Sequence, residues 1–160
     1  MTEDLALCRK WTLRAHGQQI VVVKKPVESS QHVLMKAFLW ALYLPQFPQV
    51  GIEIGLGVRY RPDVVARCPD GKVLFWGEAG HVGADKLRSL VRRYRSTHFA
   101  LARWDTSLKT VCSMVEDALH GLRREAPFDI LCFPRDAGDR FINGDSEVIV
   151  GFDDVPWQRL

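Results

Sequence analysis

The sequence lacks the features that mark membrane-spanning, fibrous and disordered proteins. None of its apolar runs reaches the roughly 20 residues that a membrane helix requires. It has no internal repeat, no low-complexity stretch and no Pro/Gly-rich linker, so a single domain over residues 1–160 is expected at this length. The N-terminus carries acids where a signal peptide would be basic, and we therefore expect a cytoplasmic protein.

Cysteine is scarce, and the cysteines lie far apart along the chain. They are Cys8, Cys68, Cys112 and Cys132, and no two of them form a CxxC pair. Buried reduced thiols are therefore a better interpretation of these residues than disulfides or a zinc site.

The composition is that of a globular protein. Hydrophobic residues make up 47% of the chain and charged residues 26%, close to the average for soluble proteins. A chain of this length can bury roughly 70% of its unfolded surface. The net charge of +3 is only a weak indication of a polyanionic partner.

The N-terminal third of the sequence predicts a β-hairpin followed by a buried helix. Alternating apolar residues over 13–25, around a turn at 15–18, predict two strands. A helix is expected to begin at Ser29 or Ser30 and to end before Pro45. Apolar residues occupy most sides of this helix, so it should lie deep against a sheet.

The rest of the chain predicts a mixed α/β fold. Strands are expected over 50–56, 61–68, 73–79, 97–104 and 128–133, and helices over 84–95 and 107–124. Residues 64–79 predict a hairpin, because Pro69-Asp70-Gly71-Lys72 has the chemistry of a tight turn. A last hairpin is expected over 140–152. This order favours a hairpin-rich sheet flanked by helices.

Two carboxylates stand at one end of the hairpin expected over 64–79. Pro62-Asp63 begins one strand and Glu78 ends the other, so chain reversal brings both acids to the same end of the sheet. Carboxylate oxygens at such a place suit Mg²⁺ or Mn²⁺, and such an ion can polarise a phosphate group. A structural interpretation stands beside this one: Asp63 could be a turn residue, and Glu78 could be an acid that ends a core strand.

The motifs around these acids resemble those of a known nuclease group. RPDVVARCPDGKVLFWGEAG resembles the PD-(D/E)xK nuclease superfamily, which has the restriction-endonuclease-like fold. Together with ESSQHVLMKAFLWALYL before it and FINGDSEVIVGFDDVPWQ after it, the segment is similar to the YaeQ family, a bacterial branch of that superfamily. The resemblance covers most of the chain. It implies a restriction-endonuclease-like α/β fold, with a mixed sheet, flanking helices and the acid-bearing hairpin at its centre.

The resemblance also implies roles for single residues. Asp63 and Glu78 match the metal-binding acids, and the carbonyl of Ala79 matches the backbone ligand of the metal. The lysine of the superfamily falls two residues after the second acid, where this chain has Gly80. Glycine is usual there in the YaeQ branch, but it removes a side chain that would orient water and stabilise developing charge.

A replacement for the missing lysine must come from elsewhere in the chain. Lys86, at the start of the next expected helix, is the first candidate, and Lys36 on the buried helix is the second. The family helix also tends to carry an acid where this chain has Gln31. Glu28 and Glu53 are candidate substitutes for that acid, with little to choose between them.

The densest basic run follows the acids along the chain. Lys86, Arg88, Arg92 and Arg95 belong to one expected helix, and the three arginines project from the same side of it. They could bind a phosphate backbone beside the carboxylates. They could equally be a solvated face that covers the core, and the two interpretations stay open.

The leading functional hypothesis is a metal-dependent phosphodiesterase that acts on nucleic acid. In it, Asp63 and Glu78 hold Mg²⁺ or Mn²⁺, and Lys86 supplies positive charge. The alternative is a non-catalytic relative that keeps the fold and binds nucleic acid or protein, and Gly80 favours it. A nucleotide-processing site in the same cleft is a weaker third option. His81 could serve as a proton shuttle, although a solvated loop histidine is the better interpretation.

Overall fold

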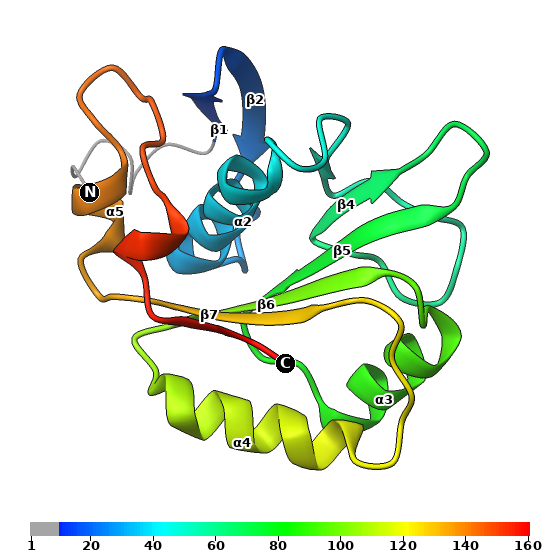
Figure 1. The fold of residues 1–160 in the computed structure, drawn as a ribbon. Coiled ribbons are helices and arrows are strands. Elements are labelled where there is room, and N and C mark those ends of the chain that lie inside the picture. The colour runs from blue at the N-terminus through cyan, green and yellow to red at the C-terminus, as the bar shows by residue number, and fades with distance from the viewer. Residues whose placement is uncertain (1–9) are drawn as a thin grey trace.

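A six-stranded mixed sheet forms the centre of residues 10–160, the part of the chain that this computed structural model describes (Figure 1). The sheet has the order β3-β4-β5-β6-β7-β8. The strands are β3 (Gly51–Ile52), β4 (Val64–Arg67), β5 (Val73–Ala79), β6 (His98–Trp104), β7 (Phe128–Phe133) and β8 (Trp157–Arg159). β5, β6 and β7 run parallel, and the remaining neighbours pair antiparallel. The predicted mixed α/β architecture is confirmed.

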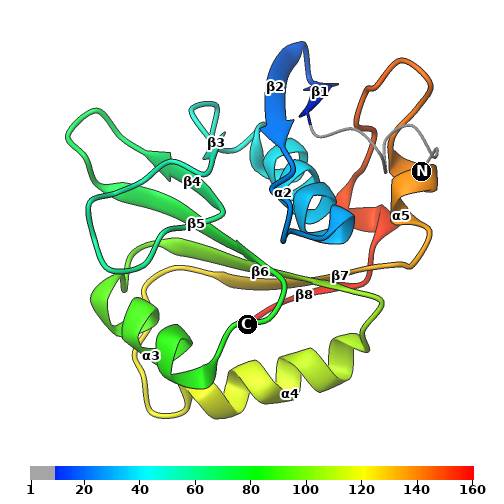
Figure 2. The same ribbon diagram turned by 180° about the vertical axis from the view of Figure 1, so that it is seen from behind.

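Helices cover both faces of this sheet (Figures 1 and 2). α2 and a separate two-stranded sheet, β1-β2, lie on one face, and α3 and α4 lie on the other. The bounds are β1 (Lys10–Ala15), β2 (Gln18–Val23), α2 (Ser30–Tyr43), α3 (Ala84–Arg93), α4 (Leu108–Leu119) and α5 (Ala137–Phe141). Each face therefore has its own apolar cluster. No helix within residues 10–160 has the length and apolar character needed to cross a bilayer.

α2 is the most deeply buried helix. Its residues from Val33 to Tyr43 are all buried, against the sheet on one side and the β1-β2 hairpin on the other. The side chain of Ser29 caps the helix by accepting a hydrogen bond from the backbone N–H of His32 at 3.1 Å. The helix ends just before Pro45, as the sequence predicts. A helix buried on all sides needs few polar positions, so the single buried lysine in it, Lys36, requires partners.

Alternation along β5 decides which layer each side chain meets. Phe75 packs in the cluster with α2, and Trp76 packs in the cluster with α3 and α4. Glu78 therefore lies on the α3 side, and Ala79 belongs to the α2 side. A Cβ at Gly77 would lie 3.1 Å from Val64 and 3.3 Å from Leu39, so the glycine lets α2 approach the hairpin closely.

The C-terminal hairpin expected over 140–152 forms, but it is shorter than predicted. At its turn the Asn143 side chain accepts from the backbone N–H groups of Asp145 and Glu147. Ile142 forms an antiparallel bridge with Val148, and the backbone N–H groups of Asn143 and Ile149 donate to the carbonyls of Glu147 and Phe141. The segment also exchanges backbone hydrogen bonds with Arg14 of β1. α5 occupies the start of the expected hairpin, and the last strand, β8, forms further on against β7.

Two further elements are shorter than the sequence predicts. The strand expected over 50–56 is reduced to β3, because Glu53 has a positive φ of 56° that ends extended backbone. The helix expected over 107–124 ends at Leu119, two residues before a glycine with φ of 77°.

The cysteines agree with the thiol interpretation where they are described. Cys112 and Cys132 are buried free thiols, and Cys68 is a half-buried free thiol. Cys8, and the part of the predicted N-terminal strand before residue 10, lie outside the described residues.

Candidate functional site

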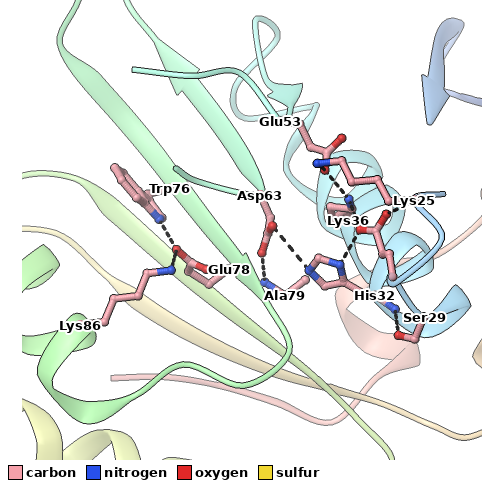
Figure 3. Close-up of polar contacts among 11 residues, drawn as sticks. Lys25, Ser29, His32, Lys36, Glu53, Asp63, Trp76, Glu78, Ala79 and Lys86 are labelled. Atoms are coloured by element: carbon pink, nitrogen blue, oxygen red, sulfur yellow. Dashed lines mark hydrogen bonds and ion pairs between the residues drawn. The ribbon is translucent and has the colours of Figure 1, made fainter. Parts of the chain in front are cut away.

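The central hairpin brings Asp63 and Glu78 to the same end of the sheet. β4 and β5 pair with Val64 opposite Gly77, and the backbone N–H of Asp63 donates to the Gly77 carbonyl at 3.1 Å. Continuing this register places Asp63 beside Glu78 on the neighbouring strand. Residues in such a pair have Cβ atoms roughly 5 Å apart. The two acids singled out in the sequence are therefore neighbours in space (Figure 3).

Asp63 links the hairpin to α2. Its Oδ2 accepts a hydrogen bond from the backbone N–H of Ala79 at 2.8 Å, and its Oδ1 lies 3.5 Å from Nε2 of His32 (Figure 3). The side chain is 20% exposed, so solvent reaches the carboxylate. Ala79 thus fixes the orientation of Asp63 through its N–H. A role for its carbonyl as a metal ligand stays a prediction.

Glu78 points toward α3 and is almost completely buried. Its Oε1 accepts from the indole Nε1 of Trp76 at 2.9 Å and lies 3.2 Å from Nζ of Lys86. Burial raises the pKa of Glu78, and the charge of Asp63 raises it further, although Trp76 and Lys86 act in the opposite direction. This carboxyl therefore has a poorly compensated charge, and the nearest cation is the lysine that the sequence analysis ranked first.

A second set of charges occupies the α2 side of Asp63. Glu28 accepts from Nζ of Lys36 at 2.5 Å and lies 2.6 Å from Nδ1 of His32, while Lys36 also reaches Glu53 at 2.8 Å (Figure 3). Burial alone would raise the pKa of Glu28, but hydrogen bonds from Lys36, Lys25 and His32 hold it below its usual value. Lys36 is 1% exposed and is held by two acids. Within residues 10–160 it contacts neither Asp63 nor Glu78.

His32 is the site residue that the sequence analysis missed. It lies between two carboxylates, Glu28 on Nδ1 and Asp63 on Nε2. The hydrogen bond with Asp63 is the main reason why its pKa is raised. The spacing offered a signal, because His32 and Lys36 share one face of α2 at a separation of four residues, and Glu28 precedes His32 by the same interval, just before the N-cap. Glu28 and Glu53, the two candidate substitutes for the missing helix acid, both belong to this set.

A cavity of about 400 Å³ opens beside these residues. Its lining comprises Lys25, Glu28, His32, Glu53, Arg61, Pro62 and Asp63. Asp63 lines this cavity, whereas Glu78 does not line it and lies on the α3 side of the sheet. The cavity combines a histidine, carboxylates and two exposed cations, which is the chemistry needed to bind a charged group and to move a proton.

The donor atoms between the two acids suit a hard divalent cation. Oε2 of Glu78 makes no hydrogen bond within residues 10–160, and Oδ1 of Asp63 has only the 3.5 Å contact with His32. A cation between them would relieve the repulsion that raises the pKa of Glu78. The described residues contain no cluster of three or more His, Cys, Asp or Glu side chains that could hold a metal. Water would therefore supply the remaining ligands, as is usual for Mg²⁺.

The basic residues of α3 and of the segment after it separate into three positions. Lys86 lies at the acid end, in contact with Glu78. Arg88 donates from Nη1 to the carbonyls of Ala118 and His120 and so holds the end of α4. Arg92 and Arg95 are exposed near the opposite end of the sheet. The remaining candidate, His81, is an exposed loop residue.

No family model matches the chain, and no curated protein matches it either. Solved structures are similar to it, and two of them are YaeQ proteins. The YaeQ protein from Pseudomonas syringae has 21% sequence identity and a TM-score of 0.60, over 84% of this chain and 75% of that chain. The YaeQ protein from Xanthomonas axonopodis pv. citri has 15% identity and a TM-score of 0.55, over 77% of this chain and 72% of its own.

The fold is a YaeQ-like fold. At these identities the similarity of the two YaeQ structures establishes the architecture and not the chemistry. The architecture of the mixed sheet and its flanking helices is therefore similar to that of the YaeQ proteins, while the roles of individual side chains rest on the geometry described above.

Proposed function

We propose that this chain is a YaeQ-like member of the PD-(D/E)xK nuclease superfamily, and that it hydrolyses phosphodiester bonds of nucleic acid with Mg²⁺ or Mn²⁺. One observation carries the proposal: Asp63 and Glu78 lie together where β4 begins and β5 ends, and the ammonium group of Lys86 contacts Glu78. The YaeQ-like fold supports it, because the resemblance of the motifs and the similarity of the structures point to the same group.

In this proposal each residue near the hairpin has a defined task. Asp63 and Glu78 hold the cation, and the backbone N–H of Ala79 keeps the Asp63 carboxylate in place. When bound, the cation would polarise the phosphate and lower the pKa of water. Lys86 is 30% exposed on its side chain, so its ammonium group can contact both Glu78 and a phosphate oxygen that gains charge.

His32 completes the proposed site on the α2 side. Its ring is held by Glu28 and faces Asp63, and it lines the cavity of about 400 Å³. Because its pKa is raised by Asp63, the ring holds a proton more firmly than an isolated histidine does. We assign it the task of giving that proton to a group bound in the cavity.

The deciding experiment is calorimetric titration of the purified chain with Mn²⁺. We expect metal-dependent heat in the wild type and its loss in Asp63→Asn. Asp105→Asn is the matched control, because it removes one exposed carboxylate, which within residues 10–160 pairs with exposed Arg135. A wild type without metal-dependent heat would overturn the proposal. Cleavage of a mixed DNA and RNA oligonucleotide pool with Mn²⁺, and its loss in Glu78→Gln, would then extend the result from binding to hydrolysis.

A non-catalytic nucleic-acid-binding or protein-binding module is the second candidate. Gly80 stands where the superfamily has its lysine, and Glu78 is only 5% exposed and already paired with Lys86. Both observations favour a site without catalytic activity. The two candidates differ in one outcome: the module would bind oligonucleotides without cleaving them, with or without Mn²⁺.

We further propose that the protein acts in the cytoplasm. The described thiols of Cys68, Cys112 and Cys132 are all free, as expected in a reducing compartment. A nuclease acting on cellular nucleic acid would find its substrate there.

A further inference from the structure

Five basic side chains surround a second cavity, at the opposite end of the central hairpin from the two acids. The cavity has a volume of about 710 Å³. The β4-β5 turn region contributes Arg67 and Lys72, and the end of α3 and the residues after it contribute Arg92, Arg93 and Arg95. Residues from two separate elements therefore bring their charges to one space.

These charges are only partly compensated by the protein. All five side chains are exposed, and none of them forms an ion pair with another residue of the described range 10–160. The one acid in the lining is Glu125, which accepts a hydrogen bond from Ser96 at 2.9 Å, and Asp70, in the same turn as Lys72, attracts that lysine. Five cations against these two carboxylates leave an excess of three, equal to the +3 of the whole chain. The basic character of this protein is thus concentrated at this cavity.

Arg124, next to the cavity, has a structural role that the five exposed cations do not share. Arg124 is half-buried, and its guanidinium donates to four backbone carbonyls: those of Tyr94, Thr97, Ala126 and Pro127. These bonds fasten the loop after α3 to the loop before β7 and make one wall of the cavity rigid. Because Arg124 already performs this task, the exposed cations are not needed to hold the loops together.

The helix dipole also fails to explain the cluster. Basic residues at a helix C-terminus are stabilising, which gives Arg92 and Arg93 a structural interpretation. Arg67 and Lys72 belong to the hairpin, and no such interpretation applies to them. Their position opposite the end of α3 brings further positive charge to a place where positive charges already repel one another.

We propose that this cavity is a phosphate-binding subsite for a nucleic-acid strand, away from the acid pair. The proposal rests on the proposed function in naming nucleic acid as the ligand. Arginine binds phosphate in a bidentate manner, which suits a site with four arginines. Leu56 and Val58, which also line the cavity, offer an apolar surface for a sugar or a base. The volume is that of a typical small-ligand site and accommodates one nucleotide unit.

The length of β5 sets the distance from this subsite to the acids. Val73 lines the cavity at one end of the strand, and Glu78 lies five residues further along it. Five residues of strand span about 16 Å at a rise of about 3.3 Å per residue. Phosphates of a B-form strand advance about 3.4 Å each along the axis, so the subsite would hold a phosphate about five nucleotides from the bond at the acids.

The test is fluorescence anisotropy with a labelled single-stranded 20-nucleotide DNA in EDTA, at several salt concentrations. The double variant Arg67→Ala/Lys72→Ala should raise the dissociation constant at least tenfold. It should also reduce the slope of log K against log salt by about 1.4, since each lost phosphate contact on a single strand contributes about 0.7. The control, Lys10→Ala/Lys109→Ala, removes the same charge from two other exposed positions and should change the constant less than twofold.

Each outcome decides the proposal. An equal loss of oligonucleotide affinity in both double variants would overturn the proposal, because binding would then depend only on the net charge of the protein. Binding of tripolyphosphate to the wild type without any binding of the oligonucleotide would overturn it as well. The EDTA makes the measurement independent of hydrolysis. If the protein binds the strand through Arg67 and Lys72 but gives no heat with Mn²⁺, the phosphate-binding subsite is supported and the proposed nuclease activity is overturned. Thermal melting confirms that both double variants are folded.

Discussion

Two buried acids in the same sheet, Asp129 on β7 and Glu78 on β5, have opposite environments. Asp129 accepts from His98, Tyr43 and Arg159, at distances between 2.6 and 3.1 Å. Burial alone would raise the pKa of Asp129, but these hydrogen bonds, led by that of His98, lower it to about 2. Glu78 has fewer partners, and its pKa is raised.

The difference separates an acid that serves the fold from one available for chemistry. Asp129 joins α2, β6 and β8 to β7, and all its partners are side chains of this chain. Glu78 keeps one oxygen without a hydrogen bond within residues 10–160 and stands next to a second acid. A buried charge is tolerated only when it is paired. The incomplete pairing of Glu78 is therefore the feature that points to a ligand from outside the chain.

Asp129→Asn should have the largest effect on stability. The amide cannot balance His98 and Arg159 together, so a network that joins four elements loses its acceptor. We expect a loss of about 3 kcal/mol in the free energy of unfolding, the range found when one partner of a buried pair is removed. Urea denaturation at pH 7 measures it. Asp105→Asn, which breaks an exposed ion pair, should lower the free energy of unfolding by about 0.5 kcal/mol or less. An equal loss in the two variants would mean that the buried network of Asp129 stabilises the fold no more than an exposed ion pair does.

The pH dependence of stability should carry opposite contributions from the two acids. The folded pKa of Asp129 lies below its unfolded value of 3.8, so its stabilisation is complete above that value and is lost as the pH falls toward 2. At 1.36 kcal/mol per pKa unit this contribution is about 2 kcal/mol. The pKa of Glu78 is raised above 4.5, so stability decreases as the pH rises from that value through the folded one.

Urea midpoints measured from pH 2 to pH 8 would resolve these contributions. Asp129→Asn should remove part of the rise in stability between pH 2 and pH 4. Glu78→Gln should remove the decrease that begins near pH 4.5. A wild-type profile that Asp129→Asn leaves unchanged below pH 4 would contradict the assignment of the low pKa to this carboxyl.

The sequence predicts the hairpin and its acids because short-range rules decide them. The turn chemistry of Pro69-Asp70-Gly71-Lys72 fixes the reversal, and alternation along the strand then places Glu78 on the side of Trp76. Lys86 follows eight residues later at the start of a helix, which is close enough to return to the same strand end. The contact between Lys86 and Glu78 is therefore within reach of local rules, while its role as a replacement for the missing lysine stays a prediction.

The remaining parts depend on partners that are distant in the sequence. His32 meets Asp63 across 31 positions, so nothing beside it in the chain identifies its partner. Arg88 follows the predicted helical spacing, but its acceptors at the end of α4 lie 30 and 32 positions away. The C-terminal hairpin lies where it is expected, but the bonds between the backbone of residues 146–148 and Arg14 of β1 are another such long-range pairing. Local propensity cannot anticipate such pairings.

Glu78→Gln should have a much smaller effect on stability than Asp129→Asn, and this gives the sharpest test of the comparison. The amide oxygen can still accept from the indole of Trp76, and the buried charge and its repulsion with Asp63 disappear. Lys86 loses its partner, but its side chain is 30% exposed and can turn to solvent. We expect the free energy of unfolding to change by less than about 1 kcal/mol. The change can be a gain, because carboxylates retained for function are commonly neutral or costly for stability.

Urea denaturation at pH 7, with Asp129→Asn measured in parallel, gives this change. A loss as large as that of Asp129→Asn would mean that Glu78 is a structural acid like Asp129, and the main reason to look for a metal at this end of the sheet would be gone.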